Sequence, residues 1–191
     1  MKKCVFFFAV LLLFFAADAQ SDANRLPGLD KSPMDMAYYP ANFPVLKIQD
    51  KANGPLVARA IYSRPQKSNR AVFGDLVEYN KVWRLGANEA TEIEFYRDVK
   101  IGGKKVVKGK YTLYALVNPE QWTLIVNRET DTWGAFKYDE KKDVARVDVP
   151  VKKLPAPVEP FTMTFTKAGA GISLVIAWDD VEVALPIDLK P

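Results

Sequence analysis

The sequence predicts an all-β protein, a single β-sandwich or jelly-roll-like domain with an extended N-terminal arm. Short segments in which apolar and polar residues alternate recur along the chain, and residues 161–165 (Phe-Thr-Met-Thr-Phe) are a clear case. Clusters of Gly, Pro, Asn and Asp separate these segments at short intervals. No window has the apolar spacing of a helix of ordinary length. Many short strands joined by turns are typical of a sandwich.

Three regions are expected along the chain: a signal peptide (residues 1–19), a proline-punctuated arm (20–43) and the β-sandwich domain (44–191). Lysines follow Met1, an apolar run extends to Ala17, and a small-residue motif ends at Ala19. This order is typical of a secretory signal peptide, and the apolar run is short for a membrane span. A retained membrane anchor is the alternative. We expect export to the periplasm or the extracellular space, with no membrane insertion after cleavage.

The composition excludes several function classes. The chain has no histidine, and its only cysteine is Cys4, within the expected signal peptide. Serine–histidine and cysteine–histidine pairs are therefore excluded, as are zinc sites built on imidazole. No spaced loop of oxygen ligands suggests calcium, so we expect no metal and no cofactor. The net charge is +4 and the basic residues are scattered, so nucleic acid is not an expected partner.

The arm and the strands follow from local patterns. The prolines of the arm prevent a long helix. The part of the arm from residue 29 onward is rich enough in Met, Tyr and Phe to dock on the domain. Disorder throughout the arm is the alternative.

A central strand that is apolar on both faces is expected at 111–117. We predict that Trp122, Leu124, Phe161, Phe165 and Leu174 are in the core. Other strands are expected at 45–49, 56–62, 99–101, 106–107, 122–127, 144–149, 172–178 and 181–185, with hairpin turns at 102–103, 169–171 and 179–180 that make the last three strands a meander.

The most informative stretch is residues 82–95, Val-Trp-Arg-Leu-Gly-Ala-Asn-Glu-Ala-Thr-Glu-Ile-Glu-Phe. Ile93 and Phe95 alternate with glutamates, which predicts a strand with one buried face. The small and polar residues before it predict a turn that presents several polar groups at one end of a sheet. The alternative is that Arg84 and Glu89 form an internal ion pair while Trp83 fills the core.

Residues 79–91, Tyr-Asn-Lys-Val-Trp-Arg-Leu-Gly-Ala-Asn-Glu-Ala-Thr, resemble the hallmark of a bacterial secreted family known as domain of unknown function 2911. The stretches 62–65, 102–103 with 109–111, and 133–139 are similar to that family too. The resemblance covers roughly residues 56–187 and carries no activity that can be transferred. Two positions depart from it, because Glu78 stands where proline is common and Asn80 where glycine is common.

The two loops with the most aromatic and polar residues define the expected binding site. Arginines can engage a carboxylate or phosphate, an asparagine and a glutamate add hydrogen bonds, and tryptophan offers a flat apolar face. The candidate residues come from strand ends and from the loop around residue 133: Arg64, Trp83, Arg84, Asn88, Glu89, Trp133 and Tyr138.

Two functions remain open. The favoured one is a non-catalytic extracytoplasmic module that binds an unknown small molecule, a glycan or an envelope protein. The alternative is a hydrolase that acts through paired carboxylates on an envelope glycan or a related substrate. Whether the protein is an enzyme is not decided by the sequence. Candidate carboxylates for the second function are Glu89, Glu92, Glu94, Asp139 and Glu140.

Overall fold

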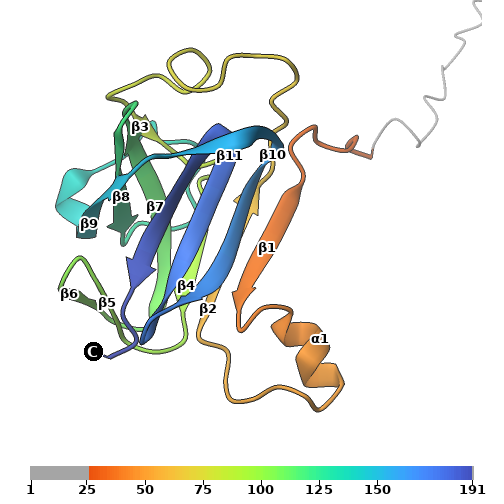
Figure 1. Cartoon of the computed structure of the whole chain (residues 1–191), viewed down its shortest axis with the longest axis vertical. Helices are drawn as coiled ribbons and strands as arrows, with labels where there is room; N and C mark the ends of the chain where they lie inside the picture. The colour runs from red at the N-terminus through yellow and green to blue at the C-terminus, as the bar shows by residue number, and fades with distance from the viewer. Residues whose placement is uncertain (1–25, 191) are drawn as a thin grey trace, which may run out of the picture.

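Two stacked antiparallel sheets form the protein, which confirms the predicted β-sandwich class (Figure 1). The computed structural model describes residues 26–190. The expected signal peptide lies outside these residues. Within them, no helix is long and apolar enough to cross a membrane.

The larger sheet has the strand order β1-β2-β4-β7-β8-β9, and β3 pairs with β7 beyond the end of β4. The second sheet is the long hairpin of β10 and β11, and β5 and β6 form a small separate hairpin. The strands are β1 (Met34–Tyr39), β2 (Ala58–Ser63), β3 (Val82–Trp83), β4 (Glu92–Phe95), β5 (Val99–Ile101), β6 (Lys104–Val106), β7 (Gly109–Val117), β8 (Gln121–Asn127), β9 (Asp143–Pro150), β10 (Lys152–Ala168) and β11 (Gly171–Ile187). Two short helices, α1 (Phe43–Ile48) and the 3-10 helix η2 (Glu140–Lys142), complete the fold.

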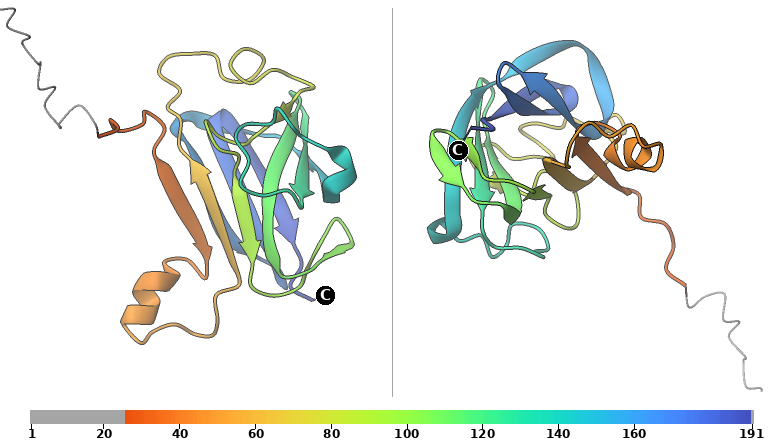
Figure 2. Two further views of the ribbon diagram at one scale, coloured as in Figure 1. Left: turned by 180° about the vertical axis from the view of Figure 1, so that it is seen from behind. Right: turned by 90° about the horizontal axis from the view of Figure 1, so that it is seen from below.

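The hydrophobic core lies between the large sheet and the β10–β11 hairpin, which crosses in front of it (Figures 1 and 2). Alternate residues of β11 face this core, from Ile172 to Trp178 and, after a shift at Asp179 and Asp180, from Val181 to Ile187. The five predicted core residues, Trp122, Leu124, Phe161, Phe165 and Leu174, are all at most 5% exposed, so that prediction is confirmed.

The central strand β7 is covered on both faces, as its apolar sequence predicts. Leu113 and Ala115 face the core between the sheets. Tyr114 faces the other way and forms a second, smaller cluster with Ala90 and Ile125. The loop that follows β8 packs on this second cluster through Ala135 and Tyr138. That loop is thereby fixed to the outer face of the large sheet.

Part of the N-terminal arm adds an edge strand to the large sheet. Residues 34–39 form β1, which pairs antiparallel with β2 along its whole length. Apolar burial is small there, since only Ala37 of this strand is buried. Main-chain hydrogen bonds therefore hold the arm more than hydrophobic contacts do.

The strand predicted at 45–49 is wrong, because residues 43–48 form helix α1. A proline in the first turn of this helix has a fixed φ that suits a helix start. Val45 and Ile48 are 53% and 85% exposed, so the alternation of apolar residues there did not report a buried face.

The hairpin turn predicted at residues 179–180 is also wrong, and with it the three-stranded meander. β11 runs through this point from Gly171 to Ile187. Asp179 takes up an irregularity with φ 52°, opposite a register shift in β10. The two aspartates form ion pairs with Lys67 and Lys153 instead of turning the chain.

Candidate ligand-binding site at the junction of two loops

A loop of residues 84–91, here called the central loop, separates β3 from β4. Both strands pair antiparallel with β7, Trp83 opposite Ala115 and Glu92 opposite Thr112. β3 and β4 therefore run in the same direction along one edge of β7. The central loop leaves this edge after β3 and returns to it at β4, so it is not a hairpin turn. The Thr91 amide donates a 3.0 Å hydrogen bond to the Arg84 carbonyl, which closes the base of the loop.

The central loop has an unusual backbone. Leu85 has φ 54° although it is fully buried, and Asn88 has φ 59°. A bulky residue at positive φ is a genuine outlier, and the surrounding structure must hold it. The Leu85 carbonyl accepts a 2.5 Å hydrogen bond from the Thr91 hydroxyl, and the Gly86 carbonyl accepts one of 3.2 Å from the Trp83 indole. The sequence therefore encodes a rigid loop at this point.

Asn80, in the loop before β3, also has positive φ, at 59°. Asparagine and glycine both tolerate this conformation. The departure from the glycine expected at this position is therefore compatible with the local backbone.

The second loop, residues 128–139 between β8 and η2, is here called the tryptophan loop, and it contacts the central loop directly. The Gly134 amide donates a 2.9 Å hydrogen bond to the Asn88 carbonyl, and the Ala90 amide donates one of 3.0 Å to the Thr132 carbonyl. Glu89 and Trp133 face each other as an isolated antiparallel bridge. The structure thus brings Asn88, Glu89 and Trp133 together.

A cavity of about 510 Å³, here called the aromatic cavity, opens on the tryptophan loop. Trp133 is 62% exposed and Phe136 is 86% exposed, although both are large apolar side chains. Gly134 has φ 67°, and a Cβ there would lie 2.6 Å from the Phe136 ring. Glycine therefore allows the ring to lie against the loop backbone. The lining residues are Tyr114, Glu129, Thr130, Asp131, Thr132, Trp133, Gly134, Phe136, Lys137 and Lys142.

Tyr138 anchors the tryptophan loop. Its hydroxyl donates a 2.6 Å hydrogen bond to the Asp143 carboxylate and accepts one of 3.0 Å from Arg146. Its ring packs edge-on against Tyr114. Burial, and then the Asp143 carboxylate, raise the pKa of Tyr138 far above its usual value. This candidate residue does not line the aromatic cavity.

Trp83 and Arg84 lie on the other side of the central loop. Trp83 is only 7% exposed and stacks on Trp178 with ring centroids 6.0 Å apart, so its face belongs to the core. The Arg84 side chain borders two further cavities, of about 210 and 290 Å³. The Arg84–Glu89 ion pair considered from the sequence does not form between these described residues, and Glu89 is exposed.

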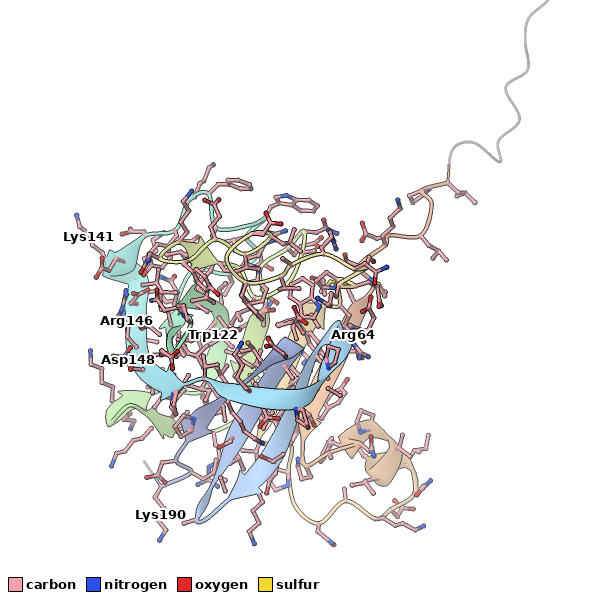
Figure 3. The ribbon with its side chains drawn as sticks, turned by 45° about the horizontal axis from the view of Figure 1, so that its top comes forward. Arg64, Trp122, Lys141, Arg146, Asp148 and Lys190 are labelled. Carbon is pink, nitrogen blue, oxygen red and sulfur yellow. The ribbon has the colours of Figure 1, made fainter. Side chains whose placement is uncertain are left out.

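Arg64 lies away from the two loops. Its guanidinium pairs with Asp35 of β1 at 2.9 Å and donates to the Phe161 carbonyl and the Thr162 hydroxyl of β10. Figure 3 shows Arg64 on the opposite side of the molecule from Arg146, the partner of Tyr138. Arg64 and Tyr138 are therefore not brought together in one site.

Four of the carboxylates considered for catalysis, Glu92, Glu94, Asp139 and Glu140, have separate partners. Glu94 pairs with Arg59 at 2.6 Å, and Glu92 pairs with Lys110 at 3.3 Å. Asp139 accepts a hydrogen bond from the Lys141 amide at the start of η2. Glu92 and Glu94 share the outer face of β4, as the alternation predicts. Within residues 26–190, no group of three Asp, Glu, His or Cys residues is placed to hold a metal ion.

Sequence reasoning missed most of the residues that line the aromatic cavity. Phe136, Asp131 and Lys137 belong to a loop whose shape depends on two positive-φ positions, Asp131 and Gly134. The spacing of Trp133 and Phe136 around a glycine was the available signal. It could not show that both rings stay exposed, because exposure depends on the sheet beneath the loop.

No curated protein and no solved structure matches this chain. A family model does match, over residues 46–187, and it confirms the resemblance seen in residues 79–91 and elsewhere. The chain belongs to that family, which is described as protein of unknown function (DUF2911).

Proposed function

We propose that this protein is an exported, non-catalytic ligand-binding module, and that it binds a carbohydrate in the aromatic cavity. The observation that carries the proposal is the exposure of Trp133 and Phe136, 62% and 86%, on a loop whose backbone is fixed. Aromatic faces stack against the apolar C–H face of a sugar ring, and rigid aromatics lose little entropy when they bind.

The polar lining of the cavity suits sugar hydroxyl groups. Thr130 and Thr132 can donate and accept, Asp131 accepts, and Lys137 donates. The volume of about 510 Å³ falls within the range of roughly 300–1,000 Å³ of small-molecule sites. A few sugar units fit this description better than a flat protein surface does.

The carboxylates of the cavity weigh against the hydrolase alternative. Glycoside hydrolysis needs one carboxyl group in the acid form near neutral pH. Glu129 forms an ion pair with Lys142, so its carboxylate is already engaged. The Thr130 side chain, and then Lys110, lower the pKa of Asp131. Neither carboxyl group is suited to donate a proton.

Export is proposed from residues 1–19 alone, whose charge and apolar pattern is that of a signal peptide. Expression of the full chain, followed by cell fractionation and mass spectrometry of the N-terminus, tests it. A mature N-terminus at Gln20 in the periplasm or medium supports export. An intact Met1 in the cytoplasm contradicts it.

Titration with soluble oligosaccharides, followed by tryptophan emission and calorimetry, tests the binding proposal. The probes are cellotetraose, maltotetraose, xylotetraose and tetra-N-acetylchitotetraose. We expect at least one to bind and to shift the emission, and Trp133→Ala to weaken that binding about tenfold or more. Phe136→Ala is expected to act in the same direction.

The matched control is Tyr96→Ala, which removes an exposed aromatic that does not line the cavity. Unchanged binding of that variant, with loss in Trp133→Ala, supports the proposal. If no probe binds, or Trp133→Ala binds like the wild type, the proposal is wrong. Release of new reducing ends by the wild type, abolished in Glu129→Gln, would favour the hydrolase instead.

A further inference from the structure

Arg84 differs from the other part-buried arginines because it has no acidic partner within residues 26–190. Arg59, Arg64 and Arg146 each pair with a carboxylate, at 2.6, 2.9 and 2.8 Å respectively. The Nε atoms of Arg84 and Arg59 are both buried without a hydrogen-bond partner among the described residues, but Arg59 still binds Glu94 through its Nη2 atom. Arg84 is part-buried, and a buried donor atom that is left without a partner needs an explanation.

A recess of about 210 Å³, here called the arginine recess, lies beside Arg84 under the central loop. Its polar side chains are Ser32, Arg70 and Arg84, and its apolar walls include Trp83 and Trp178. No Asp or Glu lines it. Two arginines, the part-buried Arg84 and the exposed Arg70, therefore border a small recess that has no carboxylate in its lining.

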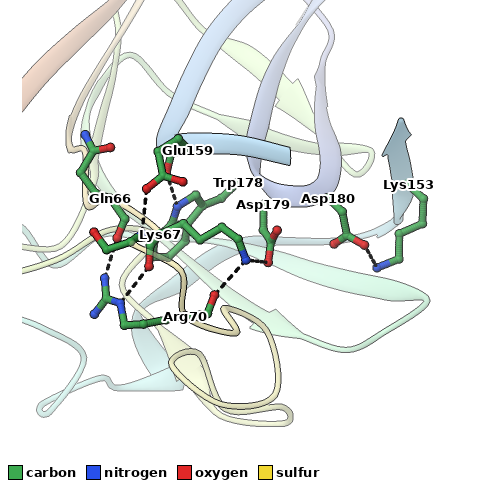
Figure 4. Close-up of polar contacts among 9 residues, drawn as sticks. Gln66, Lys67, Arg70, Lys153, Glu159, Trp178, Asp179 and Asp180 are labelled. Carbon is green, nitrogen blue, oxygen red and sulfur yellow. Dashed lines mark hydrogen bonds and ion pairs between the residues drawn. The ribbon is translucent and has the colours of Figure 1, made fainter. Parts of the chain in front are cut away.

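Arg70 is fixed in place by the loop that carries it. It donates from Nε to the Lys67 carbonyl at 2.9 Å and from Nη2 to the Gln66 carbonyl, as Figure 4 shows. Carbonyl groups accept these hydrogen bonds without neutralising the charge. The loop is itself tied to β10 and β11, because Lys67 pairs with Asp179 at 2.9 Å and Glu159 accepts from the Ser68 amide at 2.7 Å.

The nearby carboxylates are already occupied. Asp179 pairs with Lys67, Asp180 pairs with Lys153, and Glu159 binds the Ser68 amide (Figure 4). Glu78, which lines the cavity on the other side of Arg84, pairs with Lys81.

We infer that the arginine recess binds the carboxylate group of an anionic ligand, with Arg84 and Arg70 as its cationic partners. A guanidinium engages a planar carboxylate through two parallel hydrogen bonds. The recess is smaller than the roughly 300 Å³ of a typical small-molecule site, so it receives a terminal group and not a whole ligand. The positive φ of Leu85 supports the inference, since backbone strain is concentrated at functional sites.

Burial shifts the pKa of the Arg84 guanidinium. It lowers the pKa of the guanidinium from its usual value, with no carboxylate to offset the effect. Arginine nevertheless keeps its charge, so an incoming anion removes an unfavourable interaction as well as adding favourable ones.

The arginine recess and the aromatic cavity each share lining residues with a third cavity. On the other side of Arg84, the cavity of about 290 Å³ is lined by Phe136, which also lines the aromatic cavity. If the proposed carbohydrate function holds as well, the ligand is an acidic sugar. This extension rests on the proposed function, whereas the carboxylate site does not.

NMR of the arginine Nε–H signals during titration with sodium acetate tests the site directly. Sodium chloride at equal ionic strength is the reference, and sodium phosphate is a parallel probe. We expect a saturable shift of the Arg84 signal with acetate and not with chloride. A signal that does not move, that moves equally with chloride, or that responds to phosphate alone overturns the carboxylate assignment.

Variants then identify the partners. Arg70→Gln is expected to weaken acetate binding about tenfold, and Arg84→Lys likewise, because lysine keeps the charge but loses the bidentate geometry. Arg128→Gln, which removes an exposed arginine that does not line the recess, is the matched control and should bind like the wild type. Unchanged binding in both recess variants would overturn the inference.

A neutral and acidic pair of sugars separates this inference from the proposed function. The probes are tetragalacturonate and its methyl ester, which differ in charge at the carboxyl groups. We expect Arg84→Gln to weaken binding of the acid about tenfold but not of the ester, and Trp133→Ala to weaken both. If acetate binds while neither of these sugars nor any of the four neutral oligosaccharides does, the carboxylate site stands and the carbohydrate proposal fails. If Arg84→Gln binds the acid like the wild type, the extension to acidic sugars is wrong.

Discussion

The Arg64 guanidinium and the Asp35 carboxylate form an ion pair at 2.9 Å, and this pair joins the edge strand β1 to the end of β2. The same guanidinium donates to the Phe161 carbonyl and the Thr162 hydroxyl of β10. Arg64 therefore holds three strands from both sheets together. From its sequence context it was a candidate for ligand binding, whereas in the structure its donors are used within the fold.

We predict that Arg64→Ala lowers the free energy of unfolding by about 2–4 kcal/mol, because three partners lose a charged donor. Asp35→Ala removes only one of these contacts, at a side chain that is 42% exposed, and should cost less than about 1 kcal/mol. Urea denaturation of both variants measures the difference. An Arg64→Ala protein as stable as the wild type, but unable to bind ligand, would show that Arg64 is a ligand-binding residue.

The central loop should be sensitive to Gly86→Ala. Gly86 has φ 147°, and a Cβ there would lie 2.6 Å from the Ser63 Oγ atom. That hydroxyl already donates to the Ala87 carbonyl and accepts from the Ala87 amide, both at 2.6 Å. We expect a loss of about 2–4 kcal/mol, from the unfavourable φ together with the displaced hydroxyl.

Gly103→Ala is the matched control for that substitution. Gly103 has φ 75° and nothing within 4 Å of the added Cβ, so only the backbone conformation is penalised, by about 1 kcal/mol. Thermal unfolding of the two variants separates the two contributions. Equal losses would show that the contact with Ser63 has no energetic importance.

Arg84→Met should make the protein more stable while it removes anion binding. The substitution replaces a part-buried cation, whose Nε has no partner, by an apolar side chain of similar length. We expect the free energy of unfolding to rise by about 1 kcal/mol or more. A gain in stability with a loss of function is typical of a residue kept for binding.

Lys81→Met provides the comparison, since Lys81 is exposed and pairs with Glu78. Loss of an exposed pair should change stability by less than about 1 kcal/mol. If Arg84→Met instead unfolds the protein, Arg84 has a structural partner and the arginine recess is not a binding site.

The sequence was sufficient for the fold class and the core, because alternation and burial follow the same rule in most strands. Leu124 and Leu174 lie in short segments where apolar and polar residues alternate, and both are fully buried. At Val45 and Asp179 the local pattern conflicted with tertiary context. A proline-started helix replaced one strand, and an unbroken ribbon replaced a turn. The alternation around Val45 was misleading because α1 buries none of its residues, whereas the course of the chain at Asp179 depends on pairing with the distant strand β10.

The sequence predicts the general region of the candidate site but not which of its residues contact one another. Asn88 and Trp133 meet through a backbone hydrogen bond from Gly134, which no side-chain pattern encodes. Trp83 and Trp133 have the same composition signal, yet one is 7% and the other 62% exposed. The difference in exposure comes from position, because Trp83 lies in β3 beside the core whereas Trp133 lies on a loop over the outer face of the sheet.

The last prediction concerns Tyr138 and pH. Its hydroxyl binds Asp143 and Arg146, and burial followed by the Asp143 carboxylate raises its pKa well above the usual value of 10.0. A raised pKa in the folded state means that the stabilisation by Tyr138 is complete below pH 10. It is lost as pH rises from about 10 toward the folded-state pKa, because the unfolded chain releases the proton first.

Tyr138→Phe should therefore be less stable than the wild type near neutral pH, because Asp143 and Arg146 lose a hydrogen-bond partner. The gap in the free energy of unfolding between the two proteins should narrow above pH 10, where only the wild type has this group to ionise. Urea titrations of both proteins from pH 7 to about 11 measure the gap, and taking the difference cancels the other tyrosines. A gap that is constant or widens with pH would contradict a raised pKa, and Tyr138 would then not be the part-buried anchor of the tryptophan loop.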